Sequence, residues 1–200
     1  MKNRWNFRWM ICVFLVFSLM VLFTGCGYNS LQQMEEEVNK AWSDIQTTLQ
    51  RRADLIPNLV EVVKGYAKHE RETLDSVVSA RTKATQTTIS ANDLADPEKL
   101  RQFGEAQGAL TSALSKLLVV VEQYPDLKAN QNFLDLQTQL EGTENRINVA
   151  RQRYNEAASI FNASIRKFPY NLTNNFLLHL DRKAYFQADS AAQAAPSVKF

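Results

Sequence analysis

The chain has 2 histidines, the residues with the clearest potential for metal chemistry, and neither stands in a complete motif. His69 begins a run that resembles the zinc motif His-Glu-x-x-His, in which histidines one helical turn apart hold the metal. Thr73 occupies the place of the second histidine. His179 follows Phe176, whereas the helices of di-iron bundles carry glutamate at that offset. A Gly-x-Ser-x-Gly elbow is absent from the sequence, and its 6 glycines are too dispersed for a phosphate-binding loop. We therefore expect no catalytic residue, no metal and no cofactor, and a protein that is not an enzyme.

Cys26 is a candidate for covalent modification. The residues from Met10 to Phe23 are apolar apart from one serine, which suits the core of an export signal better than a spanning helix of about 20 residues. The four residues that end at Cys26 read Phe-Thr-Gly-Cys and are similar to the lipobox of bacterial lipoprotein signals, whose cysteine is acylated. The lipobox usually has Leu, Val or Ile where this chain has Phe23, so an uncleaved transmembrane helix is the alternative. We interpret residues 1–25 as a lipoprotein-type signal or transmembrane anchor, residues 26–30 as a tether, and Cys26 as the candidate lipidation site.

The charge distribution gives the same orientation for either anchor. Lys2, Arg4 and Arg8 precede the apolar run, and no charged residue occurs between Trp9 and Gln33. Because Lys and Arg are enriched on the cytoplasmic flank of membrane segments, we expect the long C-terminal part on the extracytoplasmic side of a bacterial membrane. Without those three cations, the chain has 20 Lys and Arg against 21 Asp and Glu. This near-neutral body excludes nucleic acid as a partner, so the membrane contact must come from the N-terminal lipid or helix.

From Leu31 onward, apolar residues recur at alternating spacings of three and four, which is the helical period. The longest series runs from Ala129 to Phe168 and resembles a coiled-coil seam. Three further seams run from Leu31 to Arg52, from Ile56 to Ala84 and from Leu100 to Tyr124. Four rods of comparable length can bury their apolar stripes against one another. The sequence therefore predicts an all-α fold: a long antiparallel up-and-down four-helix bundle over residues 31–168, with an N-terminal membrane anchor.

Prolines mark the expected helix ends. Pro97 follows an aspartate that can cap a helix and suits the first helical position. Pro125 and Pro169 end the helices before them, because the residue that precedes a proline avoids the helical region. Pro57 lies inside a helical pattern. We expect the chain to reverse direction between Arg52 and Pro57, and a kink in one long helix is the alternative.

The pattern changes after the last helix. Residues 169–200 are predicted to form a short amphipathic segment and a mobile, Ala-rich C-terminal tail. Phe200 combines an apolar side chain with the terminal carboxylate, and peptide-binding modules capture ends of this type. Phe200 is therefore a candidate docking residue, and a passive tail is the alternative.

Polar residues are concentrated in two segments, 51–74 and 141–158. If these segments belong to neighbouring helices, some of the residues could form buried pairs that fix the register of the helices. A surface for a protein partner is the second interpretation, and catalysis is a distant third. The candidate residues are Arg51, Arg52, Asp54, Asn58, His69, Glu70, Glu144, Asn145, Arg146, Arg151 and Asn155.

Several stretches carry a family resemblance: GYNSL at 27–31, RRADLIPNLVEVVKGYAKHERETL at 51–74, YPDLKANQNFLDLQ at 124–137, EGTENRINVARQRYNEAA at 141–158 and RKFP at 166–169. Together they resemble the LemA family of bacterial membrane proteins. The resemblance implies an up-and-down four-helix bundle displayed from a membrane by an N-terminal anchor. It supplies no catalytic motif to transfer to this chain.

These observations favour a membrane-anchored, extracytoplasmic helical bundle. We expect it to serve protein interaction or scaffolding in the bacterial envelope, with a protein partner of unknown identity and no catalytic activity. The alternative is a bundle that binds or senses a small ligand at the membrane surface.

Overall fold

The structure, a computed structural model, describes residues 2–187, apart from the side chains of residues 2–8, 12 and 16–26. The side chain of Cys26 and the whole of Phe200 lie outside the described residues, so both assignments stay predictions. Within the described residues the chain forms helices, turns and one extended segment, with no strand. The all-α fold class is confirmed.

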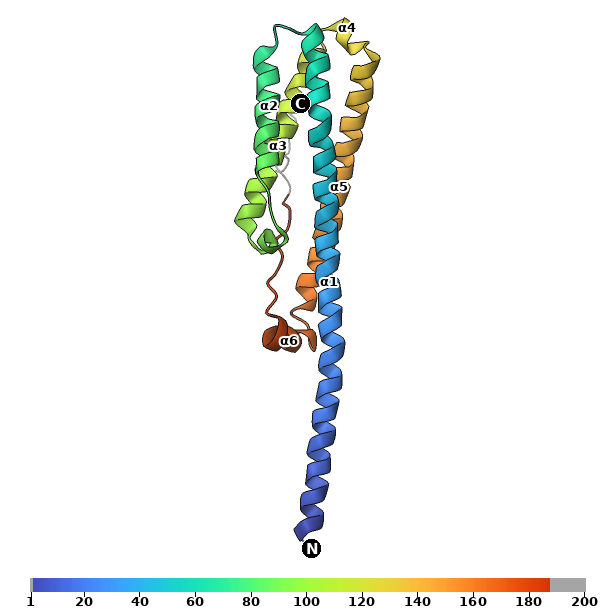
Figure 1. The fold of residues 1–200 in the computed structure, drawn as a ribbon, viewed down its shortest axis with the longest axis vertical. Helices are drawn as coiled ribbons and strands as arrows, with labels where there is room; N and C mark the ends of the chain where they lie inside the picture. Colours follow the sequence, from blue (N-terminus) through green and yellow to red (C-terminus); the bar gives the residue numbers. More distant parts are fainter. Residues whose placement is uncertain (1, 188–200) are drawn as a thin grey trace, which may run out of the picture. The chain divides into compact units, whose positions relative to one another are not determined.

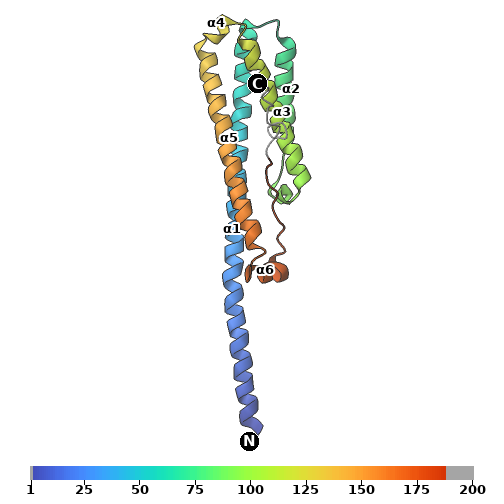
Figure 2. The ribbon, with the colours of Figure 1, turned by 180° about the vertical axis from the view of Figure 1, so that it is seen from behind.

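The helices follow one another along the chain as Figures 1 and 2 show. They are α1 (Lys2–Tyr66), α2 (Arg71–Gln86), the 3-10 helix η1 (Ala91–Ala95), α3 (Pro97–Val121), α4 (Pro125–Lys128), α5 (Gln131–Ser164), α6 (Tyr170–Thr173) and the π-helix η2 (Asn174–Leu178). No helix among the described residues has a stretch that is both long enough and apolar enough to cross a membrane.

The reversal expected between Arg52 and Pro57 is wrong, because α1 continues through Pro57 to Tyr66. Ile56, Leu59 and Val63 are buried on one face of this part of α1, so stopping the helix at Pro57 would break a continuous apolar stripe. Pro57 itself is exposed. The chain reverses instead in the short segment 67–70, between α1 and α2.

A side chain of α2 compensates for the proline. Because Pro57 has no N–H, it cannot donate to the carbonyl of Ala53, four residues earlier. Arg81 Nε donates a hydrogen bond of 2.8 Å to that same carbonyl oxygen. The backbone acceptor that the proline leaves without its helical partner is thus satisfied from the next helix.

The other predicted boundaries are close to the observed ones. The Asp96 carboxylate accepts hydrogen bonds from the backbone N–H groups of Glu98 and Lys99, and Pro97 begins α3, as predicted. The helix expected to reach Phe168 ends earlier, at Ser164, and the Phe168 side chain is 79% exposed. The last apolar position of that seam therefore does not belong to the core.

The chain divides into two compact units. Unit 1 comprises Met1–Asn39 and Glu156–Lys183, and unit 2 comprises Lys40–Asn155 and Ala184–Phe200. In unit 2, α2 and α3 lie side by side (Figures 1 and 2). One apolar cluster of this unit includes Ile56 and Val63 of α1, Val77 of α2, Leu117 of α3, Leu127 of α4 and Phe133 of α5. Burial of one such side chain stabilises the folded state by about 1.5–3 kcal/mol. The apolar faces of the long helices in this unit therefore pack against one another.

Unit 1 combines the first part of α1 with the end of α5, α6 and η2. Lys183 is buried. Its Nζ lies 2.7 Å from Glu35 Oε1 and 5.5 Å from the centre of the Phe161 ring. The side-chain amide of Asn162 both donates to the carbonyl of Lys183 and accepts from its N–H, each at 2.8 Å. Asn174 makes the same pair of hydrogen bonds with Leu180. Two asparagine amides thus hold an extended segment by its main chain.

Candidate functional site

A buried cation lies inside unit 2. The side chain of Arg52, on α1, is 2% exposed. Its Nη1 donates to Glu144 Oε2 at 2.8 Å and to Thr111 Oγ1 at 3.1 Å, and its Nη2 donates to Gln107 Oε1. We call Arg52, Gln107, Thr111 and Glu144 the Arg52 centre.

The Arg52 centre connects all four long helices. Arg52 belongs to α1, Gln107 and Thr111 to α3, and Glu144 to α5. Gln107 Nε2 donates at 3.0 Å to the backbone carbonyl of Ala84, on α2. A shift of any one of these helices along its axis would break hydrogen bonds to a charged group, which are stronger than bonds between neutral groups.

Burial lowers the pKa of Arg52 from its ordinary value, while the neighbouring Glu144 carboxylate opposes that shift. Because an arginine in a protein is not deprotonated, the guanidinium stays charged. The cost of burying that charge is offset by one ion pair and two neutral acceptors. The Glu144 side chain is 36% exposed, so one side of the ion pair faces solvent.

The structure brings together some of the predicted polar residues and separates others. Arg52 and Glu144 form the ion pair, and Arg151 and Asn155 both contact Phe186. The Glu70 carboxylate accepts a hydrogen bond of 2.9 Å from the hydroxyl of Tyr124. The remaining candidates lie on the exposed surface: Arg51, Asp54, Asn58, His69, Asn145 and Arg146.

A second polar region of unit 2 holds the extended residues 184–187, which we call the strap. Asn155 Oδ1 accepts from the N–H of Phe186 at 2.9 Å, and Asn155 Nδ2 donates to its carbonyl at 3.0 Å. The hydroxyl of Tyr154 donates to the carbonyl of Ala184 at 3.0 Å, and the N–H of Ala184 donates to the carbonyl of Leu94 at 2.7 Å. Four hydrogen bonds therefore bind the main chain of two strap residues.

The ring of Phe186 sits among aromatic side chains of three helix segments. It stacks on Trp42 with ring centres 6.1 Å apart, meets Tyr154 edge-on at 5.4 Å and lies 6.4 Å from Phe103. The Arg151 guanidinium carbon lies 5.3 Å from the centre of the same ring. Burial raises the pKa of the Tyr154 hydroxyl, which stays a hydrogen-bond donor. We call Trp42, Phe103, Arg151, Tyr154 and Asn155 the Phe186 socket.

Tyr154 lies within the predicted seam from Ala129 to Phe168, and Arg151 and Asn155 are among the predicted polar candidates, but no sequence pattern connects them with Phe186. One signal was available. Asn155 and Asn162 are a heptad apart on α5, and asparagine is uncommon along an apolar helix face unless its amide has partners. What such an amide binds is not visible in the helical period.

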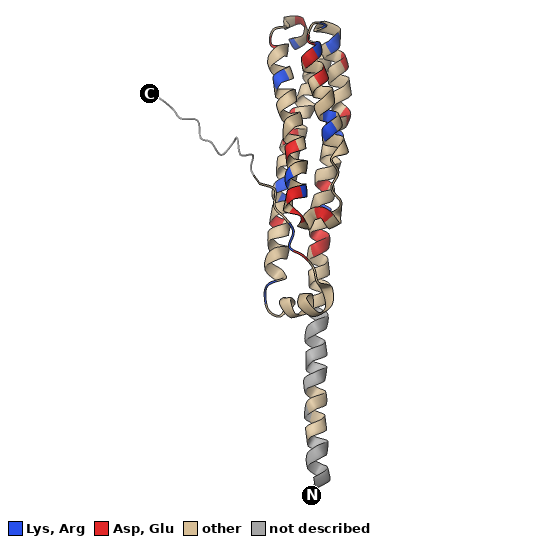
Figure 3. Ribbon diagram, turned by 90° about the vertical axis from the view of Figure 1, so that its left-hand side faces the viewer, with Lys and Arg blue, Asp and Glu red and all other residues tan. Residues whose placement is uncertain are grey.

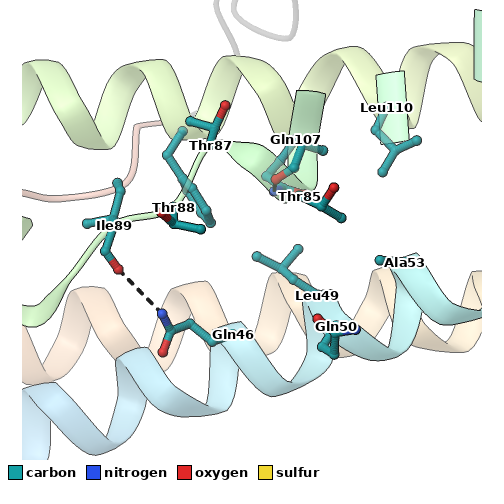
Figure 4. Close-up of a pocket in the computed structure, with 12 residues that line it drawn as sticks. Gln46, Leu49, Gln50, Ala53, Thr85, Thr87, Thr88, Ile89, Gln107 and Leu110 are labelled. Atoms are coloured by element: carbon teal, nitrogen blue, oxygen red, sulfur yellow. Dashed lines mark hydrogen bonds between the residues drawn. The ribbon is translucent and has the colours of Figure 1, made fainter. Parts of the chain in front are cut away.

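A cavity of about 160 Å³ opens between α1, the segment after α2, and α3 of unit 2. Figure 4 shows Gln46, Leu49 and Gln50 of α1 facing Thr85, Thr88 and Ile89 across it. Gln46 Nε2 donates to the carbonyl of Ile89 at 3.4 Å. The volume is below the roughly 300–1,000 Å³ of typical small-molecule pockets, so it suits water or a very small ligand.

Charge on the described surface is mixed. Figure 3 shows Lys and Arg interspersed with Asp and Glu along the helices. The described residues contain no group of three or more His, Cys, Asp or Glu side chains that could hold a metal ion.

The sequence comparisons identify the family. The LemA family model matches residues 41–200. The chain belongs to the LemA family. The resemblance found in the sequence motifs is therefore confirmed, and the matched range contains both the Arg52 centre and the Phe186 socket.

Relatives of this LemA-family chain carry two kinds of name. Protein LemA of Metamycoplasma hominis is 31% identical over 161 residues, which cover 80% of this chain and 68% of the relative. Magnetosome protein MamQ 2 of Paramagnetospirillum magneticum is 29% identical over 180 residues, which cover 82% of this chain and 66% of the relative. Magnetosome protein MamQ of Magnetospirillum gryphiswaldense is 25% identical over 160 residues, covering 72% and 59%. The chain thus spans less than two thirds of the length of these MamQ relatives.

Proposed function

We propose that this LemA-family chain is a non-catalytic scaffold of the bacterial envelope. Residues 31–168 form an antiparallel up-and-down four-helix bundle on the extracytoplasmic side of the membrane. Residues 1–25 supply the signal or anchor, residues 26–30 the tether, and residues 169–200 a short amphipathic segment and tail. The bundle presents a surface that binds a protein partner.

The Arg52 centre is the observation that carries this proposal. Each hydrogen bond of the Arg52 guanidinium goes to a side chain on another helix, and Gln107 extends the contacts to a fourth. A charge arranged in this way acts on helix register, the best-attested role of buried polar groups in helical assemblies. A rigid arrangement of long helices is what a scaffold needs.

A polar stripe on α1 is the surface that we propose for the partner. Arg51, Asp54 and Asn58 are exposed and follow one another at spacings of three and four residues, so they share one helix face. Asp54 Oδ1 accepts a hydrogen bond from Gln50 on the same face. Exposed polar side chains at fixed positions of a rigid helix can provide specific contacts at low entropic cost.

Capture of partners with the full chain in detergent, followed by mass spectrometry, tests this proposal. A protein partner in fixed stoichiometry should accompany the parent chain and should be lost from the variant Arg51→Ala/Asp54→Ala/Asn58→Ala. A control variant, Glu122→Ala/Lys128→Ala, removes an exposed ion pair elsewhere in unit 2 and should retain the partner. Absence of any stoichiometric protein partner would refute the scaffold proposal.

The anchor has its own test. Growth with a labelled fatty acid should label the parent chain and Cys12→Ala but not Cys26→Ala, because Cys12 lacks the preceding small residues. Mass spectrometry should then find the first 25 residues missing. An unlabelled chain that keeps Met1 would instead mean that the N-terminal helix is the anchor, with the same orientation.

Binding of a small ligand is the second candidate function, and the cavity between α1 and α3 favours it. Thr85 lines this cavity and is exposed, so Thr85→Trp should fill the opening without disturbing buried side chains. Native mass spectrometry should detect a bound molecule in the parent chain and not in Thr85→Trp. Equal masses of adducts in both chains would exclude this cavity as the ligand site.

A further inference from the structure

The Phe186 socket binds the strap through the kinds of contact that peptide-binding sites use. Its four hydrogen bonds involve only main-chain atoms of Ala184 and Phe186. Between these two residues, the Tyr185 side chain is 41% exposed. Main-chain bonds combined with one side-chain pocket are typical of sites that recognise extended segments.

We propose that the Phe186 socket exchanges straps between molecules, so that it takes the strap of a second copy of this chain. The site would require an aromatic residue at the position of Phe186. This proposal goes beyond the scaffold function above and does not depend on the anchor or on the α1 stripe.

The pocket for the ring explains the aromatic requirement. Trp42, Phe103 and Tyr154 surround the Phe186 ring with centre distances of 5.4–6.4 Å. Arg151 adds a cation 5.3 Å from the ring centre, which an aliphatic side chain would not attract. A segment without an aromatic residue at this position would lose both kinds of contact.

The segment that carries the strap can leave without breaking a helix. Residues 179–187 form neither helix nor strand. Their main chain is held largely by side chains, including the amides of Asn174 and Asn162 in unit 1 and of Asn155 in unit 2. The segment begins at His179, whose φ of 51° is in the left-handed region. The chain therefore changes direction between η2 and the segment.

The strap of a second copy can make the same hydrogen bonds and ring contacts in the socket as the chain's own strap. Residues 180–187 of that copy offer the same main-chain groups and the same ring, so the bonds of the closed form are re-formed in the exchanged form. Exchange of an identical element between protomers is a low-cost route to dimers for this reason. An extended segment of eight residues reaches roughly 26–29 Å, which sets the greatest distance over which the exchange can occur.

Complementation between two full-length variants tests the exchange. Phe186→Ala keeps the socket and loses the ring, whereas Arg151→Ala/Asn155→Leu damages the socket and keeps the strap. With different tags in one detergent solution, the first variant should capture the second about tenfold more than it captures itself. Two chains that both carry Glu141→Ala, which removes an exposed side chain of α5 outside the socket and the strap, should associate like the parent.

A labelled peptide with the sequence of residues 181–187 gives an independent measurement. It should bind saturably to the full-length Phe186→Ala chain, and the corresponding peptide with alanine for the phenylalanine should bind about tenfold more weakly or worse. If circular dichroism shows that Phe186→Ala does not fold, Phe186→Leu takes its place in both experiments. The proposal is overturned if the two variants do not associate preferentially, or if the two peptides bind equally well.

Discussion

The Arg52 centre and the Phe186 socket lie in the same unit but hold polar groups in different ways. The Arg52 centre buries a formal charge among side chains whose positions are set by helices. The Phe186 socket uses a neutral amide to satisfy the backbone of a segment that has no helix of its own. The first joins helices whose apolar period is visible in the local sequence, while the second orders a segment that has no such period.

This difference determines how each region responds to the loss of a side-chain partner. Loss of a partner in the Arg52 centre leaves a buried charge, and the penalty falls on the packing of the long helices. Loss of the asparagine amide in the socket frees backbone groups that can return to water together with the strap. We therefore expect global destabilisation from the first and local release from the second.

The largest expected effect comes from Tyr154, which belongs to the core and to the socket at once. Tyr154 and Phe161 are both fully buried on the long seam of α5, so replacing either by alanine should lower the free energy of unfolding by about 3–5 kcal/mol. Urea unfolding followed by circular dichroism measures this. Tyr154→Phe is the matched variant and should cost only about 1 kcal/mol, the hydrogen bond to the strap. Parent-like unfolding of Tyr154→Ala would contradict its place in the core.

Glu144→Ala should destabilise the chain by about 2–3 kcal/mol. This is below the usual 3–5 kcal/mol for breaking a buried pair, because solvent reaches Glu144 and can partly screen the remaining charge. Glu141→Ala on the exposed surface of the same helix should change the free energy of unfolding by no more than about 0.5 kcal/mol. Equal unfolding curves for the two variants would mean that the pair does not stabilise the helices.

Asn155→Ala should cost about 1–2 kcal/mol for its two hydrogen bonds. The decisive measurement is hydrogen exchange of individual amides: the N–H of Phe186 should lose protection while amides of the α2 and α3 core keep theirs. Asn155→Asp retains an acceptor for that N–H but has no donor for the carbonyl, so it should fall between parent and alanine. Loss of protection throughout unit 2 would remove the contrast with the Arg52 centre.

The smallest expected effect is a local loss of stability around Asp93 at low pH. A hydrogen bond from Lys99, aided by Ser90, lowers the pKa of Asp93 in η1 to about 2. Because the pKa is lower in the folded chain than in the unfolded chain, this stabilisation is complete above about pH 4 and is lost as the pH falls through 2. The adjacent Leu94 carbonyl accepts a hydrogen bond from the strap, so the protection of the Ala184 amide relative to its intrinsic exchange rate should fall over that interval. Asp93→Asn should exchange at a rate that differs less from the parent at low pH than at neutral pH.

The sequence was sufficient for the all-α class and for most helix ends, because apolar period and proline are local signals. It failed at Pro57, since the donor that satisfies the Ala53 carbonyl there, Arg81, lies on another helix and is not visible in the local pattern. It found Arg52 and Glu144 by composition, although their contact depends on how three helices pack. The role of Phe186 could not be predicted, because one aromatic residue in an extended segment has no periodicity that reveals its partners.

The hydrogen bond from Arg81 to the Ala53 carbonyl also bears on the order in which the chain folds. Until α2 is in place, α1 has a missing backbone bond at Pro57, and an isolated helix with such a defect forms poorly in water. The two residues are separated by 28 positions, a short loop to close compared with the 92 positions between Arg52 and Glu144. We expect α1 and α2 to become ordered together at an early stage, before α5 arrives to complete the ion pair.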